Sequence, residues 1–371
     1  MSGSPVRTFS FIVAVLAVLI GLFVSSYDFR AAIRSYIPST SFLIANCSEA
    51  GEMRGGMANP VSRTPLYFLS HGGPSLIEEP EHPAYGKLQE IGREITEKVK
   101  PEAVVIFSAH WQGGKNRVLV NTAEITDLIY DFYGFPDWYY SVKFPHVGSK
   151  DLAQNVMSKL ENAGIEYAPV ERGLDHGAWL PLLVAFDPKE NPLNVPIVQV
   201  SLFKNEDPDE HYHLGEAVAA LREENILVLA SGMAVHNLRD LRNSRGQDQP
   251  MPYVNSFDEA LKEAATAQPD QRKAKMAQLL KRGDARQAHP TFDHLLPIHI
   301  AAGAAGRDSG TRLFTMADGS MSWAQYRFGD VMVNETVEAN IFSFPNSTLG
   351  STSRASLIKI GVCGLCFFMV G

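Results

Sequence analysis

Short apolar runs alternate with segments of helical spacing through most of this chain. The short runs lie at residues 66–69, 103–107, 117–121, 166–170, 197–201 and 226–230. The run at 103–107 is rich in β-branched residues, as is typical of a strand buried on both faces. Apolar residues recur at helical spacing at residues 85–99, 150–163, 208–221, 257–266, 272–281 and 295–305. This alternation predicts an α/β fold: a single domain with a largely parallel central sheet flanked by helices.

The two ends of the chain differ in pattern from the domain between them. Residues 9–27 are apolar and uncharged over nearly the ~20 residues that a membrane-spanning helix needs. We therefore expect an N-terminal anchor or signal at 1–27, a linker at 28–62, a catalytic domain at 63–330, and a tail at 331–371 with an apolar end. An anchor predicts membrane association through the N-terminal segment, and the alternatives are a secreted or a cytoplasmic protein.

The composition narrows the classes of function. The chain has 371 residues and a net charge of −8, which argues against a nucleic-acid partner because nucleic acid is itself strongly negative. The three cysteines, Cys47, Cys363 and Cys366, all lie outside the expected catalytic domain. A metal site within that domain would therefore draw on other ligands.

Three histidines closely follow buried apolar runs. Residues 66–69 lead into Ser-His-Gly-Gly at His71, the run at 103–107 stops at Ser108 just before His110, and 226–230 leads through a glycine turn to His236. In an open α/β sheet, ligands bind beyond the carboxyl ends of the strands. We therefore expect the active site at this edge of the sheet, where the three histidines would share one metal ion.

The other histidines have different expected roles. His176 precedes an apolar helical run, where the positive end of the helix dipole favours the neutral imidazole that a general base needs. The alternative is that Asp175 caps the helix and His176 is exposed. His294 and His299 are five residues apart and cannot both face one metal, and His294 is the better placed. Four others are expected to be solvated or to lie in turns: His82, His146, His211 and His213.

Five motifs contain the histidines with expected chemistry: SHGGPS at His71, SAHW at His110, LDHGAW at His176, SGMAVHNLRD at His236 and HPTFDHLLPIHIAAGAAG at His294. In this order, and with the aromatic stretch IYDFYGFPDWYYSVKFP at residues 129–145, they resemble the DODA-type branch of the class III extradiol ring-cleavage dioxygenases, which are LigB-like enzymes. The resemblance covers roughly residues 64–329. It implies an aromatic ring-opening dioxygenase.

The resemblance also implies a role for each histidine. His71, His110 and His294 would bind the metal, and His236 would be a fourth ligand or a catalytic acid/base. His176 would transfer protons to and from the substrate. The aromatic loop at residues 130–140 would stack on the substrate ring and restrict its size. The alternative is that these aromatic residues pack in the core.

The metal and the substrate follow from the same resemblance. We expect Fe(II), the family's usual metal, for activity, and an all-histidine site also suits Zn(II) as an alternative occupant. The expected reaction inserts O2 into a small aromatic diol, a DOPA-like catechol, and gives a muconic semialdehyde. Two other classes of function stay open: a zinc-dependent hydrolase using the same histidines, and a non-catalytic binding protein on the same fold. The sequence makes no prediction of oligomeric state.

Overall fold

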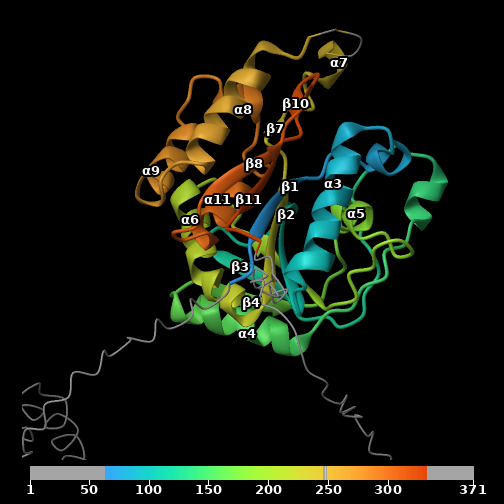
Figure 1. Ribbon diagram of the computed structural model, residues 1–371, viewed down its shortest axis with the longest axis vertical. Helices are drawn as coiled ribbons and strands as arrows, with labels where there is room; N and C mark the ends of the chain where they lie inside the picture. Colours follow the sequence, from blue (N-terminus) through green and yellow to red (C-terminus); the bar gives the residue numbers. More distant parts are fainter. Residues whose placement is uncertain (1–62, 245–246, 248, 332–371) are drawn as a thin grey trace, which may run out of the picture. The chain divides into compact units, whose positions relative to one another are not determined.

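The computed structural model describes residues 63–244, 247 and 249–331 (Figure 1). An eight-stranded sheet runs through this region in the order β4-β3-β5-β2-β6-β1-β11-β8. Its strands are β1 (Leu66–Ser70), β2 (Ala103–Gln112), β3 (Arg117–Asn121), β4 (Glu166–Val170), β5 (Ile197–Leu202), β6 (Ile226–Gly232), β8 (Gly310–Phe314) and β11 (Gln325–Phe328). Helices flank both faces of the sheet, so the predicted α/β class is confirmed.

The centre of the sheet is parallel and its margins are mixed. Strands β5, β2, β6 and β1 pair in parallel. Strands β3 and β4 are parallel to each other, but β3 runs antiparallel to β5. At the other margin, β11 is antiparallel to β1 and β8 is antiparallel to β11. The four central strands therefore end at one common edge, as the sequence predicts.

Each face of the sheet is covered by its own helices (Figure 1). Tyr67 and Leu69 of β1 pack on one face with α3 (Pro83–Glu94) and α5 (His176–Ala185). Phe68 of β1 packs on the other face, which is covered by α4 (Lys150–Asn162), α6 (Pro208–Val218), α8 (Pro252–Ala265), α9 (Pro269–Leu279) and α11 (Leu296–Ala304). Because successive residues point to opposite faces and both faces are buried, the central strands are predominantly apolar.

The helices begin and end with the expected capping chemistry. At the start of α4, Leu152 N donates to the Ser149 hydroxyl, and just past its end Gly164 has a φ of +72°, the left-handed geometry that favours glycine. The helix predicted at 85–99 is α3 followed by one π turn, and the helix predicted at 208–221 is α6 followed by a 3-10 turn. The remaining short helical segments are Pro74–Glu78, Asp137–Ser141, α7 (Leu241–Ser244) and α10 (Ala285–Ala288).

The strands near the carboxyl end of the domain are additions to the predicted set. Besides β8 and β11, the short strands β9 (Ala317–Asp318) and β10 (Met321–Ser322) form a separate three-stranded sheet with β7 (Val235–His236). These added strands have two to five residues each. Elements so short carry no periodic hydrophobic pattern, which explains why the sequence does not predict them. The small sheet places His236 next to the carboxyl edge of the main sheet.

Several predictions concern residues outside the described region. The anchor or signal at 1–27, the linker at 28–62 and the tail from residue 332 onward all lie there. Within residues 63–331, as far as the structure describes them, none of the helices combines the length and apolar character needed to cross a bilayer. The domain boundaries and the membrane association therefore stay predictions.

Candidate metal centre

Two of the predicted ligands are tied to the end of β6 by their backbones. His71 directly follows β1, and its backbone N–H donates to Gly232 O at 3.0 Å. His294 precedes α11, and its carbonyl oxygen accepts a hydrogen bond from Met233 N, also at 3.0 Å. Both histidines are buried. The carboxyl end of β6 therefore fixes the positions of two side chains that are far apart in sequence.

The third predicted ligand lies inside a strand. β2 does not stop at Ser108, as its apolar run suggests, but continues to Gln112, so the predicted strand end was wrong. The pairing of β2 with β6 ends at Ser108, and Gln112 pairs with Leu202 of β5 instead. This extension holds His110 in a strand that projects beyond β6 toward the other two histidines.

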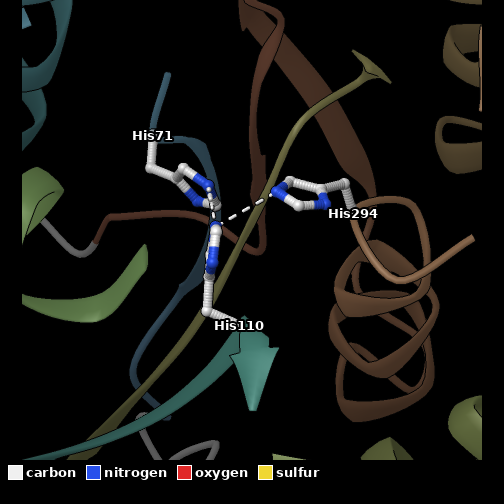
Figure 2. A group of neighbouring side chains, drawn as sticks. All are labelled: His71, His110 and His294. Atoms are coloured by element: carbon white, nitrogen blue, oxygen red, sulfur yellow. Dashed lines mark hydrogen bonds between the residues drawn. The ribbon is translucent and has the colours of Figure 1, made fainter. Parts of the chain in front are cut away.

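The ring nitrogens of the three histidines converge on one point (Figure 2). His110 Nε2 lies 3.2 Å from His71 Nε2 and 3.2 Å from His294 Nε2. The three donor atoms all lie within 4.8 Å of one another. The structure thus brings His71, His110 and His294 close enough to share one ion.

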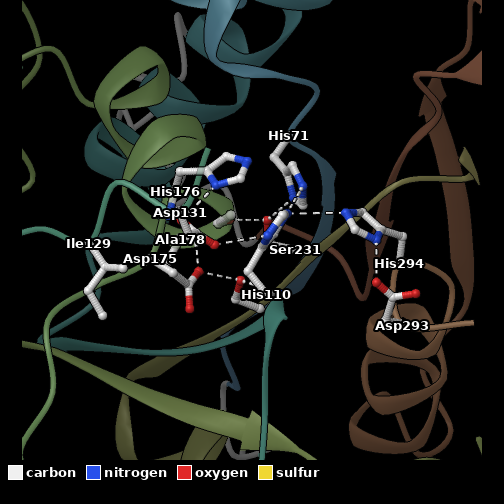
Figure 3. Close-up of polar contacts among 12 residues, drawn as sticks. His71, His110, Ile129, Asp131, Asp175, His176, Ala178, Ser231, Asp293 and His294 are labelled. Atoms are coloured by element: carbon white, nitrogen blue, oxygen red, sulfur yellow. Dashed lines mark hydrogen bonds and ion pairs between the residues drawn. The ribbon is translucent and has the colours of Figure 1, made fainter. Parts of the chain in front are cut away.

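A serine hydroxyl orients the first of these rings (Figure 3). His71 Nδ1 lies 2.9 Å from Ser231 Oγ. Ser231 donates its own hydroxyl proton to Gly177 O, so its oxygen accepts from the imidazole. The ring proton of His71 is therefore on Nδ1, and Nε2 has a free lone pair.

Carboxylates orient the other two rings. His110 Nδ1 lies 3.0 Å from an Asp131 oxygen, and His294 Nδ1 lies 2.9 Å from an Asp293 oxygen (Figure 3). Burial acts to raise the pKa of Asp293, but the hydrogen bonds from His294 and Thr291 and the charge interactions with His294 and His236 together hold that pKa well below its usual range. An ionised carboxylate only accepts hydrogen bonds, so in both histidines the proton is again on Nδ1.

This arrangement fits a divalent metal ion. Three lone pairs that face one another without a proton between them repel unless a cation lies among them. Burial lowers the pKa of His71 well below its usual range and also lowers the pKa of His294, so these rings are neutral imidazoles. Neutral imidazoles held at Nδ1 by oxygen acceptors are the usual form of histidine metal ligands. The donor set suits Fe(II) and Zn(II) alike.

A second group of ligand-type side chains, His110, Asp131 and His176, also lies within 4.8 Å. Its members already form hydrogen bonds with one another. One oxygen of Asp131 bonds His110 Nδ1, and the other lies 2.8 Å from His176 Nδ1 and accepts from His176 N at 3.0 Å. Burial acts to raise the pKa of Asp131, but the hydrogen bonds from His110 and His176 hold it well below its usual range. We therefore regard this group as a support for the metal centre.

His176 is the first residue of α5 and faces the centre (Figure 3). It is buried, so the alternative that it is exposed was wrong, although Asp175 does cap the helix as that alternative supposed. Its ring centroid lies 4.0 Å from that of His110. Burial lowers the pKa of His176, which keeps the ring neutral. With Nδ1 occupied by Asp131, the Nε2 atom of His176 is the one available to accept a proton.

His236 is held against one of the three histidines. Its ring stacks on His294 with centroids 3.6 Å apart and an interplanar angle of 9°. Burial lowers the pKa of His236 well below its usual range. The group of three convergent nitrogens does not include this ring. The structure therefore places His236 beside the centre, in face-to-face contact with His294.

A cavity of about 740 Å³ opens onto the metal centre. Its wall includes His110, His176, His236 and His294. From the aromatic loop at 130–140, Phe132 and Phe135 are the aromatic residues that line it. The tyrosines of the loop bond elsewhere: the Tyr130 hydroxyl donates to Val142 O at 2.6 Å, and the Tyr139 hydroxyl donates to Glu78. Two phenylalanines of the loop thus line the cavity, Tyr139 is buried and Tyr133 is exposed. The stacking of the loop on a substrate ring stays a prediction.

The histidines without a predicted metal role have structural surroundings of their own. His299 is buried and its Nε2 donates to Met276 O at 3.0 Å, so it points away from the centre, as expected. His213 is exposed, as expected. The expectation that His211 is solvated was wrong, because α6 turns it inward and its Nδ1 donates to Asp207 O at 2.7 Å. The neighbouring Asp209 and Glu210 are exposed.

Three histidines that could hold one metal ion thus lie at the carboxyl edge of an α/β sheet, beside a fourth histidine at the wall of one cavity. The family model for the catalytic LigB subunit of aromatic ring-opening dioxygenase matches residues 65–328. The chain therefore belongs to the LigB family, in the enzyme class of the aromatic ring-opening dioxygenases. The resemblance drawn from the sequence motifs is confirmed.

Individual relatives agree with this assignment. The chain is 34% identical over 266 residues to the protein named 4,5-DOPA dioxygenase extradiol in Beta vulgaris, across 71% of this chain and 95% of that one. It is 31% identical over 243 residues to the protein of the same name in Escherichia coli K12, across 66% of this chain and 86% of that one. A crystal structure of an uncharacterized protein from Escherichia coli K12 matches with a TM-score of 0.58 and 28% identity, covering 72% of this chain and all of that one.

Sequence reasoning does not identify the groups that orient the histidines. Ser231, Asp131 and Asp293 bond the outer nitrogens of the three rings. Asp293 is adjacent to His294 in the sequence, and that adjacency could have identified it as the partner of His294. Asp131 is remote in sequence from both of its partners, so only the fold brings it to them.

Proposed function

We propose that this protein is an extradiol dioxygenase that inserts O2 into the ring of a DOPA-like catechol. The ring carbon–carbon bond next to the diol breaks, both oxygen atoms of O2 enter the product, and the product is a muconic semialdehyde. The observation that carries the proposal is the convergence of three imidazole nitrogens beside a fourth, neutral histidine, at the wall of one cavity.

His71, His110 and His294 would hold the metal, which we propose to be Fe(II) in the active enzyme, with Zn(II) as an alternative occupant. When bound, Fe(II) supplies the redox chemistry that allows O2 to react with an aromatic diol, and Zn(II) does not have this chemistry. The hydrogen bonds at Nδ1 of the three rings keep their Nε2 atoms aimed at one point before any ligand arrives. This preorganisation leaves little to rearrange on binding.

His176 would accept the phenolic proton of the catechol at Nε2. Its Nδ1–H is held by Asp131, which is ionised and therefore stabilises the imidazolium that forms. The same carboxylate bonds His110, so one side chain orients both a ligand and the proton acceptor. The proton can return from His176 to the substrate oxygen as the ring opens.

His236 would act as a second acid/base group beside the metal and not as a fourth ligand. Its ring lies nearly parallel to that of His294 at 3.6 Å. A ligand in this position would need to turn its nitrogen toward the ion and away from that stacked arrangement. Phe132 and Phe135 would contact the substrate ring from the cavity wall.

The two competing functions have less support. A non-catalytic binding protein would be favoured if the three histidines were too far apart to share a metal, whereas their Nε2 atoms lie 3.2 Å apart in two pairs. A zinc hydrolase would use the same histidines to activate water. Membership of the LigB family favours ring opening over hydrolysis.

The experiment that tests the proposal separates metal binding from proton transfer. His176→Asn should leave the metal content unchanged and reduce turnover by about 10²–10⁴-fold, because a positioned acid/base group contributes an effect of that size. His213→Asn, on the exposed side of α6, is the matched control and should leave both unchanged. Loss of metal in His176→Asn would show that His176 is a ligand and would overturn its assigned role.

A further inference from the structure

The strand that carries His110 is irregular at the place where this histidine lies. Four residues of β2, at 108–111, lie opposite one residue of β5. The pairing of β2 with β6 ends at Ser108. Among the described residues, the pairing of β2 therefore gives His110 no partner on either neighbouring strand. A bulge of this kind leaves its residues outside the ladder, so other contacts must fix the position of His110.

One such contact leads from the backbone of His110 to the helix that begins with His176. His110 N donates to the Ser108 hydroxyl oxygen at 3.2 Å, and this hydroxyl donates to Asp175 Oδ1 at 2.6 Å. Ser108 and Asp175 have no exposed surface. Asp175 Oδ1 also accepts from Ala178 N at 3.2 Å, which caps α5 (Figure 3). One carboxylate oxygen therefore joins the strand of a predicted metal ligand to the helix of the proposed proton acceptor.

The second oxygen of this carboxylate also reaches β2. Asp175 Oδ2 accepts from Arg172 Nη1 at 2.9 Å and from Gln199 Nε2, on β5, at 2.5 Å. The guanidinium group of Arg172 lies over the ring of Trp111, 4.6 Å from its centroid. Asp175 therefore contacts β2 through Ser108, before the ligand, and through Arg172 and Trp111, just after it.

Capping of α5 does not by itself require a carboxylate at this position. Asparagine caps a helix about as well as aspartate does and has no charge to bury. Asp175 is fully buried and accepts four hydrogen bonds, two at each oxygen. An asparagine would turn its NH2 group toward two of these four donors and leave them unpaired. The carboxylate thus matches the joining of segments, and not only the capping of one helix.

We propose that Asp175 is a positioning residue that fixes His110 and His176 relative to each other. It acts on His110 through Ser108, and on His176 through the first turn of α5. Asp131 joins the same two histidines at their Nδ1 atoms, so one carboxylate holds their rings and the other holds their backbones. The part of the inference that concerns turnover rests on the proposed function, whereas the part that concerns metal binding does not.

The test removes the middle of the Asp175–Ser108–His110 chain of hydrogen bonds. Ser108→Ala deletes the hydroxyl and leaves the cap of α5 in place. In the full chain, Zn(II) affinity measured against a competing chelator should fall about 10–100-fold, the usual effect of losing a group that orients a metal ligand. With Fe(II) and DOPA, kcat should fall by at least about tenfold while KM stays within about twofold, because misplaced reacting groups affect the transition state more than substrate binding.

Asp175→Asn is the second variant, and Asp207→Asn is its matched control. Asp207 caps α6 by accepting from Asp209 N and Glu210 N, and it is exposed. Asparagine can still cap both helices. Asp175→Asn should lower Zn(II) affinity and kcat as Ser108→Ala does, and Asp207→Asn should leave both at their wild-type values. In the double variant of Ser108 and Asp175, the losses should be well short of additive, because both substitutions act on one chain of hydrogen bonds.

Wild-type Zn(II) affinity and kcat in Ser108→Ala would overturn the proposal, even if this variant unfolds more easily, because the role of Ser108 would then be structural only. Strictly additive losses in the double variant, or an equal loss in Asp207→Asn, would overturn it as well. If the wild-type protein turns over no catechol, the proposed function fails, and the Zn(II) affinities still decide whether Asp175 positions His110.

Discussion

Gly177 is the position at which a single methyl group tests the packing of the metal centre. It is the second residue of α5, and a Cβ atom there would lie 2.5 Å from Ser108 Oγ, 2.6 Å from His110 Cδ2 and 3.3 Å from His71 Cε1. All three distances are shorter than ordinary van der Waals contact. Two of the three neighbours are predicted metal ligands, so Gly177→Ala would displace the rings that must converge.

The expected size of the effect of Gly177→Ala follows from overpacking of this site. Overpacking a tight interior site costs about 1–3 kcal/mol in the free energy of unfolding. Alanine in a helix offsets this by about 0.5–1 kcal/mol relative to glycine. Displacing groups that orient metal ligands typically weakens metal binding by about 10–100-fold. We therefore expect Gly177→Ala to be less stable than wild type and to bind metal at least about tenfold more weakly.

The assay is metal titration against a competing chelator, together with denaturant unfolding of metal-free and metal-loaded protein. Gly86→Ala in α3 is the matched control, because a Cβ atom there has no neighbour within 4 Å. That variant should be stabilised by about 0.5–1 kcal/mol with unchanged metal affinity. Equal metal affinity in the two variants would refute the claim that α5 is packed directly against the ligand rings.

Three further variants test separate parts of the site and the fold. Ser231→Ala removes the acceptor of His71 Nδ1–H, so metal affinity measured by chelator competition should fall about 10–100-fold; unchanged affinity would show that this hydrogen bond does not orient the ring. His236→Asn should keep its metal by elemental analysis and lose turnover, whereas loss of metal would make His236 a ligand. Burial lowers the pKa of His299 to about 4, against 6.5 in the unfolded chain. As the pH falls, His299 therefore binds a proton in the unfolded chain before it does so in the folded protein. The free energy of unfolding should therefore fall by up to about 3 kcal/mol between pH 6.5 and 4 on account of this residue. Urea unfolding of His299→Gln should show a correspondingly smaller fall, and an equal fall in both proteins would contradict a buried neutral His299.

The sequence predicts the central strands and the histidines at their ends because both are local patterns. A continuous apolar run marks a strand buried on both faces, and β1, which contains one such run, ends just before His71. His211 shows the limit of local reasoning, since its acidic neighbours suggest solvent but α6 turns that position into the core. Whether a helical residue faces inward depends on tertiary packing, which neighbouring residue types do not specify.

The partners of the histidines depend on contacts between distant segments. Asp131 meets His110 and His176, and Ser231 meets His71, only after the sheet and α5 have packed. Trp323 lines the cavity and directly follows β10, a two-residue strand with no hydrophobic period. These residues set the orientation of the histidine rings and the shape of the cavity. No regular spacing of residues in the sequence encodes either property.

The central claim is tested most directly by loading the metal-free full chain with Fe(II) without oxygen and then adding air and catechol. Oxygen uptake and the yellow semialdehyde are recorded together, with DOPA and simple catechols as substrates and Zn(II)-loaded protein as the control. We expect one O2 consumed for each ring opened with Fe(II), and neither signal with Zn(II). Absence of oxygen uptake on every catechol, in protein that holds one tightly bound Fe(II), would contradict the account.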